Sequence, residues 1–266
     1  MKRMLSLLFV GGLTACFFLV IAGCTTSDTG RFQLNLISAD QEMQLGLTAF
    51  DQMKKDVPIS KNPEYNALVA KVGARIAEQA KSRLPDAKWE FVVFESTEAN
   101  AFCLPGGKVG VYTGILPITK TEEGLATVIG HEVAHASQHH GAERMSDALA
   151  LQKAAGWATS AVSDKYQAAA AVAFGYGEKA GELGFSRTHE SEADHVGLLY
   201  MARAGYNPEE AIRFWERFSE INKGQAGANP LQNIKWFRTH PLDAQRIADL
   251  KKWLPEAKAQ MKAAGK

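Results

Sequence analysis

The stretch His131-Glu132-Val133-Ala134-His135 determines how the rest of this sequence is interpreted. On an α-helix, positions four apart lie about 40° apart in projection and one turn apart along the axis, so both imidazoles can reach one ion. Glu132 lies about 100° round the helix from His131, beside such an ion, where a carboxylate can take a proton from water. The pattern predicts a metal-binding helix that carries its own general base.

The residues around this motif predict that its helix is anchored in the core. Apolar residues that share one helix face are Leu125, Val128, Ile129, Val133 and Ala136. The alternative is a core helix whose two histidines bind no metal. It would leave His131, Glu132 and His135 to be satisfied by other buried groups, at a cost in free energy. All 7 histidines of the chain lie between His131 and His240, and the first 130 residues contain none.

A third ligand has to come from outside the motif. His139 and His140 follow it, but along a straight helix they lie about 12 Å from His131, which is too far for one ion. A metzincin would have Gly at position 138 and His at position 141. The chain has Gln138 and Gly141, which excludes that class.

A second acidic motif offers candidates for the missing ligand. Glu190 and Asp194 are four residues apart and share one face of a predicted helix at 187–204, whereas Glu192 points about 200° away from Glu190. A glutamate on the metal with an aspartate one turn later would supply a ligand and an acceptor for the other N–H of a ligating histidine. The alternative is a solvated, charged helix without a metal.

The N-terminus has the pattern of a bacterial targeting signal. Two basic residues, Lys2 and Arg3, precede an apolar run at 4–22, and small residues then lead to Cys24, which resembles a lipoprotein lipobox. We therefore expect a signal peptide at 1–23, lipid on Cys24, a lipidated tether at 24–37 and a single domain at 38–266. Thr rather than Asp after the cysteine implies sorting to the outer membrane. The alternative is an uncleaved anchor in which Cys24 is incidental.

The remaining patterns predict an α+β fold that is predominantly helical. Ser38 with Gln41 forms a capping-box pattern that opens a helix to about residue 55. Ala101–Leu104 and Lys108–Tyr112 surround a Pro-Gly-Gly turn and indicate a β-hairpin. The other predicted elements are a strand at 89–94, a helix after Pro63, a long helical stretch from about 121, and helices at 187–204, 208–222, 242–252 and 255–263.

Composition and charge exclude several other classes of protein. The 30 basic residues nearly balance the 29 acidic ones, which gives no electrostatic reason to expect a nucleic-acid partner. With only 3 cysteines a disulfide framework is excluded, and we expect Cys103 to be a buried, inert thiol. The stretch at 146–185 is rich in Ala and Gly. It is predicted to form tightly packed helices, with a lid or a lipid-facing surface as alternatives.

Four pieces of the chain, in order, resemble the M48 family of zinc metallopeptidases. They span about 40 to 250 and comprise Asn100-Ala101-Phe102 with Pro105-Gly106-Gly107 and Tyr112-Thr113-Gly114, His131 to His135, Glu190 to Asp194, and Thr239-His240-Pro241 with Arg246-Ile247. The resemblance implies a zincin-like fold with a small sheet or hairpin beside the HExxH helix. It also implies one Zn²⁺ per chain on His131, His135 and Glu190, with Glu132 as base and Asp194 as the group that orients a ligand.

The same resemblance suggests how the remaining site residues act. It brings His240 near the site, where it is a candidate oxyanion donor or only the end of a loop; Arg187 and His140 are weaker candidates. The strand with Val109 and Val111 is expected to bind substrate by strand addition. Asn100 and Ala101 are expected to line the cleft.

Together these features predict a zinc endopeptidase of the cell envelope. Its expected substrates are unfolded or misassembled envelope proteins, and its expected location is the outer membrane, facing the periplasm through the lipid on Cys24. Strand addition recognises backbone more than side chains, so broad specificity is expected. The alternatives are an assembly or chaperone-like lipoprotein whose peptidase activity is latent or self-inhibited, and a zinc hydrolase of non-peptide amides such as cell-wall material.

Overall fold

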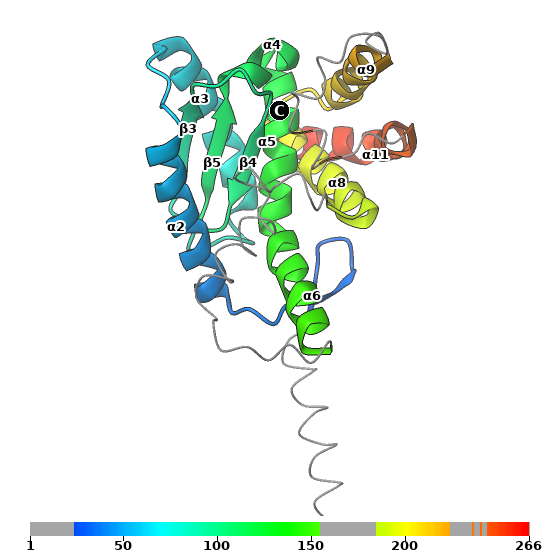
Figure 1. The fold of residues 1–266 in the computed structure, drawn as a ribbon. Coiled ribbons are helices and arrows are strands. Elements are labelled where there is room, and N and C mark those ends of the chain that lie inside the picture. The colour runs from blue at the N-terminus through cyan, green and yellow to red at the C-terminus, as the bar shows by residue number, and fades with distance from the viewer. Residues whose placement is uncertain (1–23, 155–184, 224–235, 237–239, 241–243, 266) are drawn as a thin grey trace, which may run out of the picture.

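The structure is a computed structural model that describes residues 24–154, 185–223, 236, 240 and 244–265 (Figure 1). The predicted signal peptide at 1–23 and most of the Ala/Gly-rich stretch lie outside the described residues. Within the described ranges, no helix is both long and apolar enough to cross a lipid bilayer. The fold is mostly helical with small sheets, as the sequence predicts.

A three-stranded sheet has the strand order β3-β5-β4. Strands β4 (Ala101–Leu104) and β5 (Lys108–Tyr112) are antiparallel, with Ala101 opposite Val111, so the predicted hairpin is confirmed. Its turn needs glycine, because Gly106 and Gly107 have φ values of 82° and 77°. Strand β3 (Glu90–Phe94) runs parallel to β5 on the other side. The central strand β5 is therefore paired on both edges, and all of its residues are buried.

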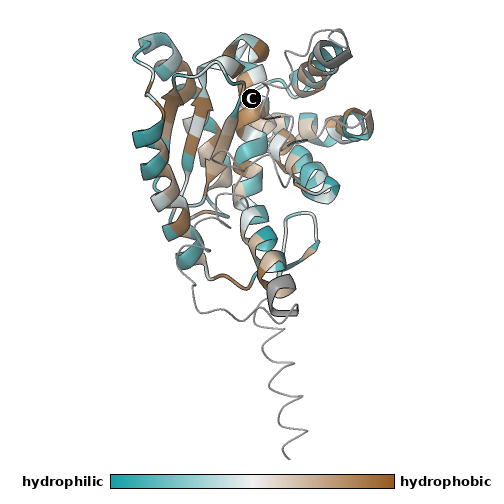
Figure 2. Cartoon of the chain, in the orientation of Figure 1, coloured by the Kyte–Doolittle hydropathy of each residue, from teal (hydrophilic) through white to brown (hydrophobic). Residues whose placement is uncertain are grey.

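Two helices before the sheet begin where the sequence predicts. Helix α2 (Ala39–Asp56) has the expected capping box, in which Ser38 accepts from the backbone of Gln41 and the Gln41 side chain accepts from the backbone of Ser38. Helix α3 (Pro63–Ala80) begins after Asn62, whose side chain caps its first turn. The apolar face of α3 is buried against β3 and the central helix α5. Figure 2 shows the largely hydrophobic strands and the mixed surfaces of the helices around them.

Helix α5 (Glu122–Ser137) runs through the middle of the molecule and carries the HExxH motif. It lies between strand β4 on one side and α8 (Arg187–Arg203) on the other (Figure 1). A short 3₁₀ turn (Thr113–Ile115) and α4 (Leu116–Thr119) lead into it, and Thr121 caps it through Gly124 N at 3.0 Å. Helix α11 (Ala244–Ala263) packs against α8, and α9 (Glu209–Lys223) packs against α5 and α11. The HExxH helix is thus enclosed by β4 and α3 on one side and by α8 and α9 on the other.

Helix α11 corrects the prediction of two separate helices at 242–252 and 255–263. A single helix runs through Pro255. Proline removes one backbone hydrogen bond, but tertiary packing can hold a helix across that gap. Leu250 and Ala257, on either side of Pro255, are both buried. Their burial explains why the helix does not end at the proline.

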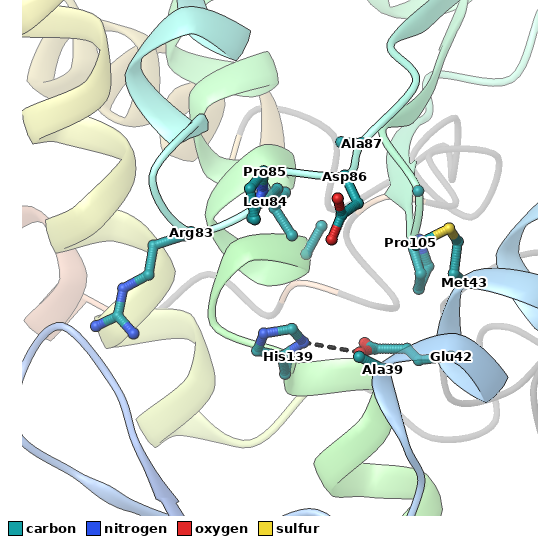
Figure 3. Close-up of a pocket in the computed structure, with 12 residues that line it drawn as sticks. Ala39, Glu42, Met43, Arg83, Leu84, Pro85, Asp86, Ala87, Pro105 and His139 are labelled. Carbon is teal, nitrogen blue, oxygen red and sulfur yellow. Dashed lines mark hydrogen bonds and ion pairs between the residues drawn. The ribbon is translucent and has the colours of Figure 1, made fainter.

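The long helical stretch expected from 121 is broken at His139. Helix α5 ends at Ser137, and α6 (His140–Ala154) begins immediately after the break. His139 has a φ of 55°, a left-handed conformation that is uncommon for residues other than glycine. Its Nδ1 lies 2.7 Å from the carboxylate of Glu42 on α2, which holds the break in place (Figure 3).

The expected tether at 24–37 contains a folded hairpin, which corrects that prediction. Strands β1 (Cys24–Thr26) and β2 (Phe32–Leu34) pair antiparallel around a turn at Gly30, whose φ is 83°. The hairpin lies beside α6 in Figure 1. Asp28 N donates to Gln138 Oε1 at 2.8 Å, and Leu36 N donates to Ser146 Oγ at 2.8 Å. These contacts tie the segment to the molecule on the C-terminal side of the HExxH helix.

Candidate metal centre

Two glycines bring the HExxH helix and α8 into backbone contact. A Cβ atom added at Gly130 would lie 2.9 Å from Gly197 O, and one added at Gly197 would lie 2.8 Å from His131 N. Real Cβ atoms do not approach so closely, so the helices can meet here only because both residues lack side chains. This contact places the acidic motif of α8 directly over the two histidines of α5.

Four side chains converge on one point between these helices. Nε2 of His131 and Nε2 of His135 lie 3.0 Å apart. The Glu190 carboxylate lies 3.6 Å from His131 Nε2 and 3.5 Å from His135 Nε2, and His240 completes a group whose ligand atoms all fall within 4.8 Å. All four residues are buried. The structure thus brings together His131, His135 and Glu190, which the sequence links only through two separate motifs.

The chemistry of this donor set fits a zinc ion. Two imidazole nitrogens and one carboxylate form a common catalytic zinc shell, with the next position open to water or substrate. Neither oxygen of Glu190 accepts a hydrogen bond from the described residues, although both are buried. Oε2 lies 2.6 Å from Arg246 Nη1. Oε1 lies 3.5 Å from its neighbour His135 Nε2. A buried carboxylate oxygen of this kind is satisfied by a metal ion.

Asp194 and Arg246 fix the orientation of His131. Asp194 Oδ1 lies 3.0 Å from His131 Nδ1, and Arg246 binds the same carboxylate through Nε at 2.6 Å and Nη2 at 2.8 Å. Burial opposes ionisation of Asp194, but Arg246 and His131 outweigh it and lower its pKa. An ionised carboxylate accepts only, so the proton of His131 sits on Nδ1. Its Nε2 lone pair therefore faces the cluster.

Glu132 lies beside the cluster and is held by an aromatic side chain. Its Oε1 accepts a 2.6 Å hydrogen bond from the indole Nε1 of Trp236. Burial raises the pKa of Glu132 to about 8, while the Trp236 hydrogen bond and Arg246 act in the opposite direction. A carboxylate with a pKa near neutrality can both accept and return a proton, as a general base requires.

His140 reaches the other ring nitrogen of His135. The break at His139 turns His140 back, so its Nδ1 lies 2.8 Å from His135 Nδ1 and its Nε2 lies 3.0 Å from Glu192 Oε2. The straight helix on which the separation of about 12 Å from His131 was based is therefore interrupted. His140 still does not join the ligand cluster, because it meets His135 on the far side of the ring.

The protonation of this second histidine pair follows from Glu192. Although burial opposes ionisation, hydrogen bonds from His140, Thr29 and Arg31 hold the pKa of Glu192 well below its ordinary value. Burial lowers the pKa of His140 to about 4, so its ring is neutral and donates from Nε2 to Glu192. Nδ1 of His140 then accepts from His135 Nδ1–H, which leaves Nε2 of His135 as a lone pair facing the cluster.

His240 lies closer to the centre than a loop-ending residue needs to be. Its Nε2 is 3.6 Å from Glu132 Oε1 and 4.0 Å from Glu190 Oε1. Its ring centroid is 5.1 Å from that of His131 and 5.2 Å from that of His135. Its Nδ1 donates to Trp236 O at 3.1 Å, so Nε2 of the neutral ring is a lone pair, as a fourth ligand requires. A donor to a reacting oxygen would need a second proton on the ring. By contrast, the exposed Arg187 is at the start of α8 and does not belong to the cluster.

The predicted substrate-binding strand requires a correction. Val109 and Val111 lie on β5, which is paired on both edges and cannot accept a further strand. The strand beside the HExxH helix is β4, which begins at Ala101 and pairs with β5 alone among the described strands. Asn100 precedes it, and the neighbouring Ala99 O accepts from Trp236 N at 3.3 Å. Strand addition is therefore possible at β4 but not at β5, because strand order cannot be read from the hairpin pattern alone.

Two further features are separate from this centre. Cys103 is a free, buried thiol, and burial raises its pKa well above the ordinary range, so it is no nucleophile. A cavity of about 80 Å³ is lined by Glu42 and His139 among others (Figure 3) and by none of the four cluster residues. Ligand pockets usually measure roughly 300–1,000 Å³, so this cavity is too small for a peptide or cofactor.

The chain is similar to a known peptidase family and to several named proteases. The family model described as "Peptidase family M48" matches residues 63–254. Mitochondrial metalloendopeptidase OMA1 of Schizosaccharomyces pombe is 34% identical over 236 residues, which cover 87% of this chain and 66% of that protein. The protein of the same name in Saccharomyces cerevisiae is 32% identical over 268 residues, covering 96% and 75%.

A bacterial relative has a more specific name. The beta-barrel assembly-enhancing protease of Escherichia coli is 28% identical over 232 residues, which cover 85% of this chain. The match spans 46% of that relative and 66% of the fission-yeast one, so the chain corresponds to only part of each.

Proposed function

The chain belongs to peptidase family M48, and we propose that it is a zinc-dependent endopeptidase of the bacterial cell envelope. The observation that carries this proposal is the convergence of His131, His135 and Glu190 beside the carboxylate of Glu132. The metalloendopeptidase names of the yeast relatives support hydrolysis of peptide bonds. The Escherichia coli relative is named as a protease that enhances β-barrel assembly, which supports a role connected with the assembly of such proteins.

Peptidases of this family use zinc, and we assign His131, His135 and Glu190 as the ligands of one ion. When bound there, zinc supplies a Lewis acid that activates water and polarises the carbonyl of the scissile bond. Asp194 holds the proton of His131 on Nδ1 at 3.0 Å, which keeps Nε2 free to bind. Arg246 neutralises part of the negative charge that Glu190 and Asp194 bring into the interior.

Glu132 moves the proton in the proposed reaction. It takes a proton from the attacking water and returns it to the nitrogen of the leaving amine. Trp236 keeps one carboxylate oxygen in place through its 2.6 Å hydrogen bond, so the other oxygen is left for this transfer. His240 Nε2 lies 3.6 Å from Glu132, but Nδ1 of the same ring lies 3.1 Å from the carbonyl of Trp236 and holds the proton of the neutral imidazole. Nε2 would therefore donate to the developing oxyanion only after the ring gains a second proton.

We assign substrate binding to the edge strand β4 and to Asn100 and Ala101 at its start. An extended peptide would add as a strand, and its backbone would supply most of the hydrogen bonds. Recognition of this kind accepts many sequences but requires an unfolded segment. The proposed substrates are therefore unfolded or misassembled envelope proteins.

The proposed location rests on the N-terminal sequence. Lipid on Cys24 would hold the enzyme at the membrane, and Thr25 after it implies the outer membrane facing the periplasm. A Cys24→Ser variant tests this assignment. Loss of the lipid label and of membrane fractionation is expected, and a variant that keeps both would contradict it.

The peptidase proposal is tested by metal analysis combined with degradation of casein, an unfolded protein. Wild type should contain one zinc per chain and cleave casein. Glu132→Gln should keep its zinc and lose cleavage, because a carboxamide cannot act as the base. The proposal fails if wild type binds no zinc or if the Gln variant cleaves as fast as wild type.

A second candidate function is envelope assembly with a self-inhibited peptidase. It is favoured by His240, whose Nε2 joins the ligand cluster and lies beside the base. In that case His240→Ala should cleave casein faster than wild type. If His240 instead donates to the oxyanion, the same variant should be slower, so the direction of change separates the two roles.

A further inference from the structure

One arginine of the β1–β2 hairpin binds two helices. Arg31 follows the turn and forms a fork on Glu143 of α6, with Nη1–Oε1 at 2.6 Å and Nη2–Oε2 at 2.8 Å. The same guanidinium binds Glu192 of α8 through Nε at 2.9 Å and Nη2 at 2.8 Å. The Arg31 side chain is only 22% exposed and that of Glu192 only 3%. A geometry of this kind restrains both carboxylates more strongly than a surface ion pair does.

Hydrogen bonds within the turn and to the end of α5 hold the backbone of Arg31 in place. Ser27 N donates to Arg31 O at 3.0 Å across the turn, and Arg31 N donates to Ser27 Oγ at 3.2 Å. Asp28 and Gln138 exchange two hydrogen bonds, at 2.8 and 2.9 Å, which fix the turn to the residue just beyond the HExxH helix. Thr29 Oγ1 donates to the second oxygen of Glu192. Arg31 and Thr29 therefore supply three donor atoms to one buried carboxylate.

Glu192 connects Arg31 to the proposed zinc ligand His135 through His140. The oxygen that accepts from Arg31 also accepts from His140 Nε2 at 3.0 Å, and His140 Nδ1 accepts from His135 Nδ1 at 2.8 Å. Each group in this series has its donor and acceptor roles set by the next. The series ends at the lone pair of His135 Nε2, which faces the ligand cluster.

We infer that Arg31 is a positioning residue for the zinc ligand His135, acting through Glu192 and His140. The hairpin at 24–34 is then a working part of the metal centre, and displacing it lowers the affinity for zinc. The inference rests on the proposed function in one respect, because it takes His135 as a ligand. It implies that zinc affinity depends on whether the segment next to the predicted lipid anchor is docked on α6 and α8.

The test measures zinc affinity on the full chain in detergent, by competition with a chelator. Outer partners of metal-bound histidines change metal affinity roughly 10- to 100-fold. Arg31→Gln and Glu192→Gln are each expected to weaken zinc binding in this range, and the double variant is expected to be no weaker than the worse single variant. The d–d spectrum of the cobalt-substituted protein should shift in the same variants, because the orientation of His135 changes.

A matched control separates this role from simple docking of the hairpin. Arg83 binds Asp28 on the same turn but makes no contact with Glu192. Arg83→Gln should therefore leave zinc affinity and the cobalt spectrum unchanged, even if it lowers the stability of the metal-free protein. Thr29→Val is a milder second variant, in case Arg31→Gln does not fold. It removes only one donor to Glu192 and should weaken zinc binding by less.

Three results would overturn the inference. The first is wild-type zinc affinity with an unchanged cobalt spectrum in Arg31→Gln, or in Thr29→Val if Arg31→Gln does not fold. The second is equal losses of zinc affinity in Arg31→Gln and Arg83→Gln. The third is additive losses in the double variant. Failure of the proposed function looks different, since wild type itself would then bind no zinc or Glu132→Gln would still cleave casein.

Discussion

The indole Nε1 of Trp236 donates a 2.6 Å hydrogen bond to Oε1 of Glu132. The donor is itself fixed by aromatic packing, because the Trp236 ring stacks on Trp215 of α9 with centroids 5.2 Å apart and an interplanar angle of 19°. Phe214 and Phe218 contact the same ring edge to face. The orientation of the proposed base thus depends on the packing of α9, which contains none of the predicted ligands.

Replacing Trp236 with Phe should slow catalysis without removing the metal. Phe keeps most of the aromatic contact but has no N–H, so Glu132 loses the bond that orients its carboxylate. We expect kcat on a peptide substrate to fall about 10-fold, which corresponds to roughly 1.4 kcal/mol of activation free energy. KM and zinc content should stay unchanged. Steady-state kinetics measures kcat and KM, and metal analysis measures zinc content. An unchanged kcat would rule out this orienting role.

Arg246 should be among the least replaceable side chains in the chain. It is buried and binds Asp194 twice, and it lies 2.6 Å from Glu190. Removing one partner of a buried ion pair typically costs about 3–5 kcal/mol, because the remaining charge is left uncompensated. We expect Arg246→Met to lose that much free energy of unfolding in urea and to bind zinc more weakly. Arg213→Met is the control: this side chain is exposed on α9, and its partner Glu210 keeps a second ion pair with Arg217, so neither quantity should change.

The local part of the site could be predicted from the sequence because helical geometry fixes it. Four-residue spacing places His131 above His135 and Glu190 above Asp194 whatever the rest of the fold does. The Pro-Gly-Gly turn similarly predicts a hairpin, because glycine adopts the two positive φ values without strain. Such features depend on residues close in sequence, and the structure agrees with them.

Other parts of the fold and site could not be predicted, because they depend on tertiary contacts that leave no local pattern in the sequence. Arg31 meets Glu192 across 161 residues of sequence, and nothing near either residue indicates the other. The break before His140 requires a positive φ at His139, which no glycine or asparagine marks. Strand order decides whether β4 or β5 has a free edge, and the hairpin motif does not contain that information. The sequence predicts only that Glu192 points away from Glu190, and its burial beside a histidine pair was missed.

The close contact of α5 and α8 makes Gly197 a sensitive position. An alanine Cβ there would lie 2.8 Å from His131 N and 2.9 Å from Gly130 C, so α8 would have to move away from α5. Overpacking of this kind typically costs about 1–3 kcal/mol of stability. Because Glu190 moves with α8, zinc affinity should fall at least 10-fold in Gly197→Ala, as measured by chelator competition. Unchanged zinc affinity would show that the two motifs tolerate a wider separation.

The pair formed by His139 and Glu42 should give stability that depends on pH. The hydrogen bond to Glu42 raises the pKa of His139 above its ordinary value, against the opposing effect of burial. A raised pKa in the folded state means that the stabilisation is complete below the unfolded value of about 6.5 and is lost as pH rises through the folded value. His139→Asn is a suitable variant, since Asn tolerates a positive φ and has no titrating ring. It should be less stable than wild type at about pH 5.5, and the difference should shrink by about pH 8.5. Urea unfolding at both pH values measures this, with Glu42→Gln expected to show the same trend. A difference that does not vary with pH would mean that the pair contributes through packing rather than charge.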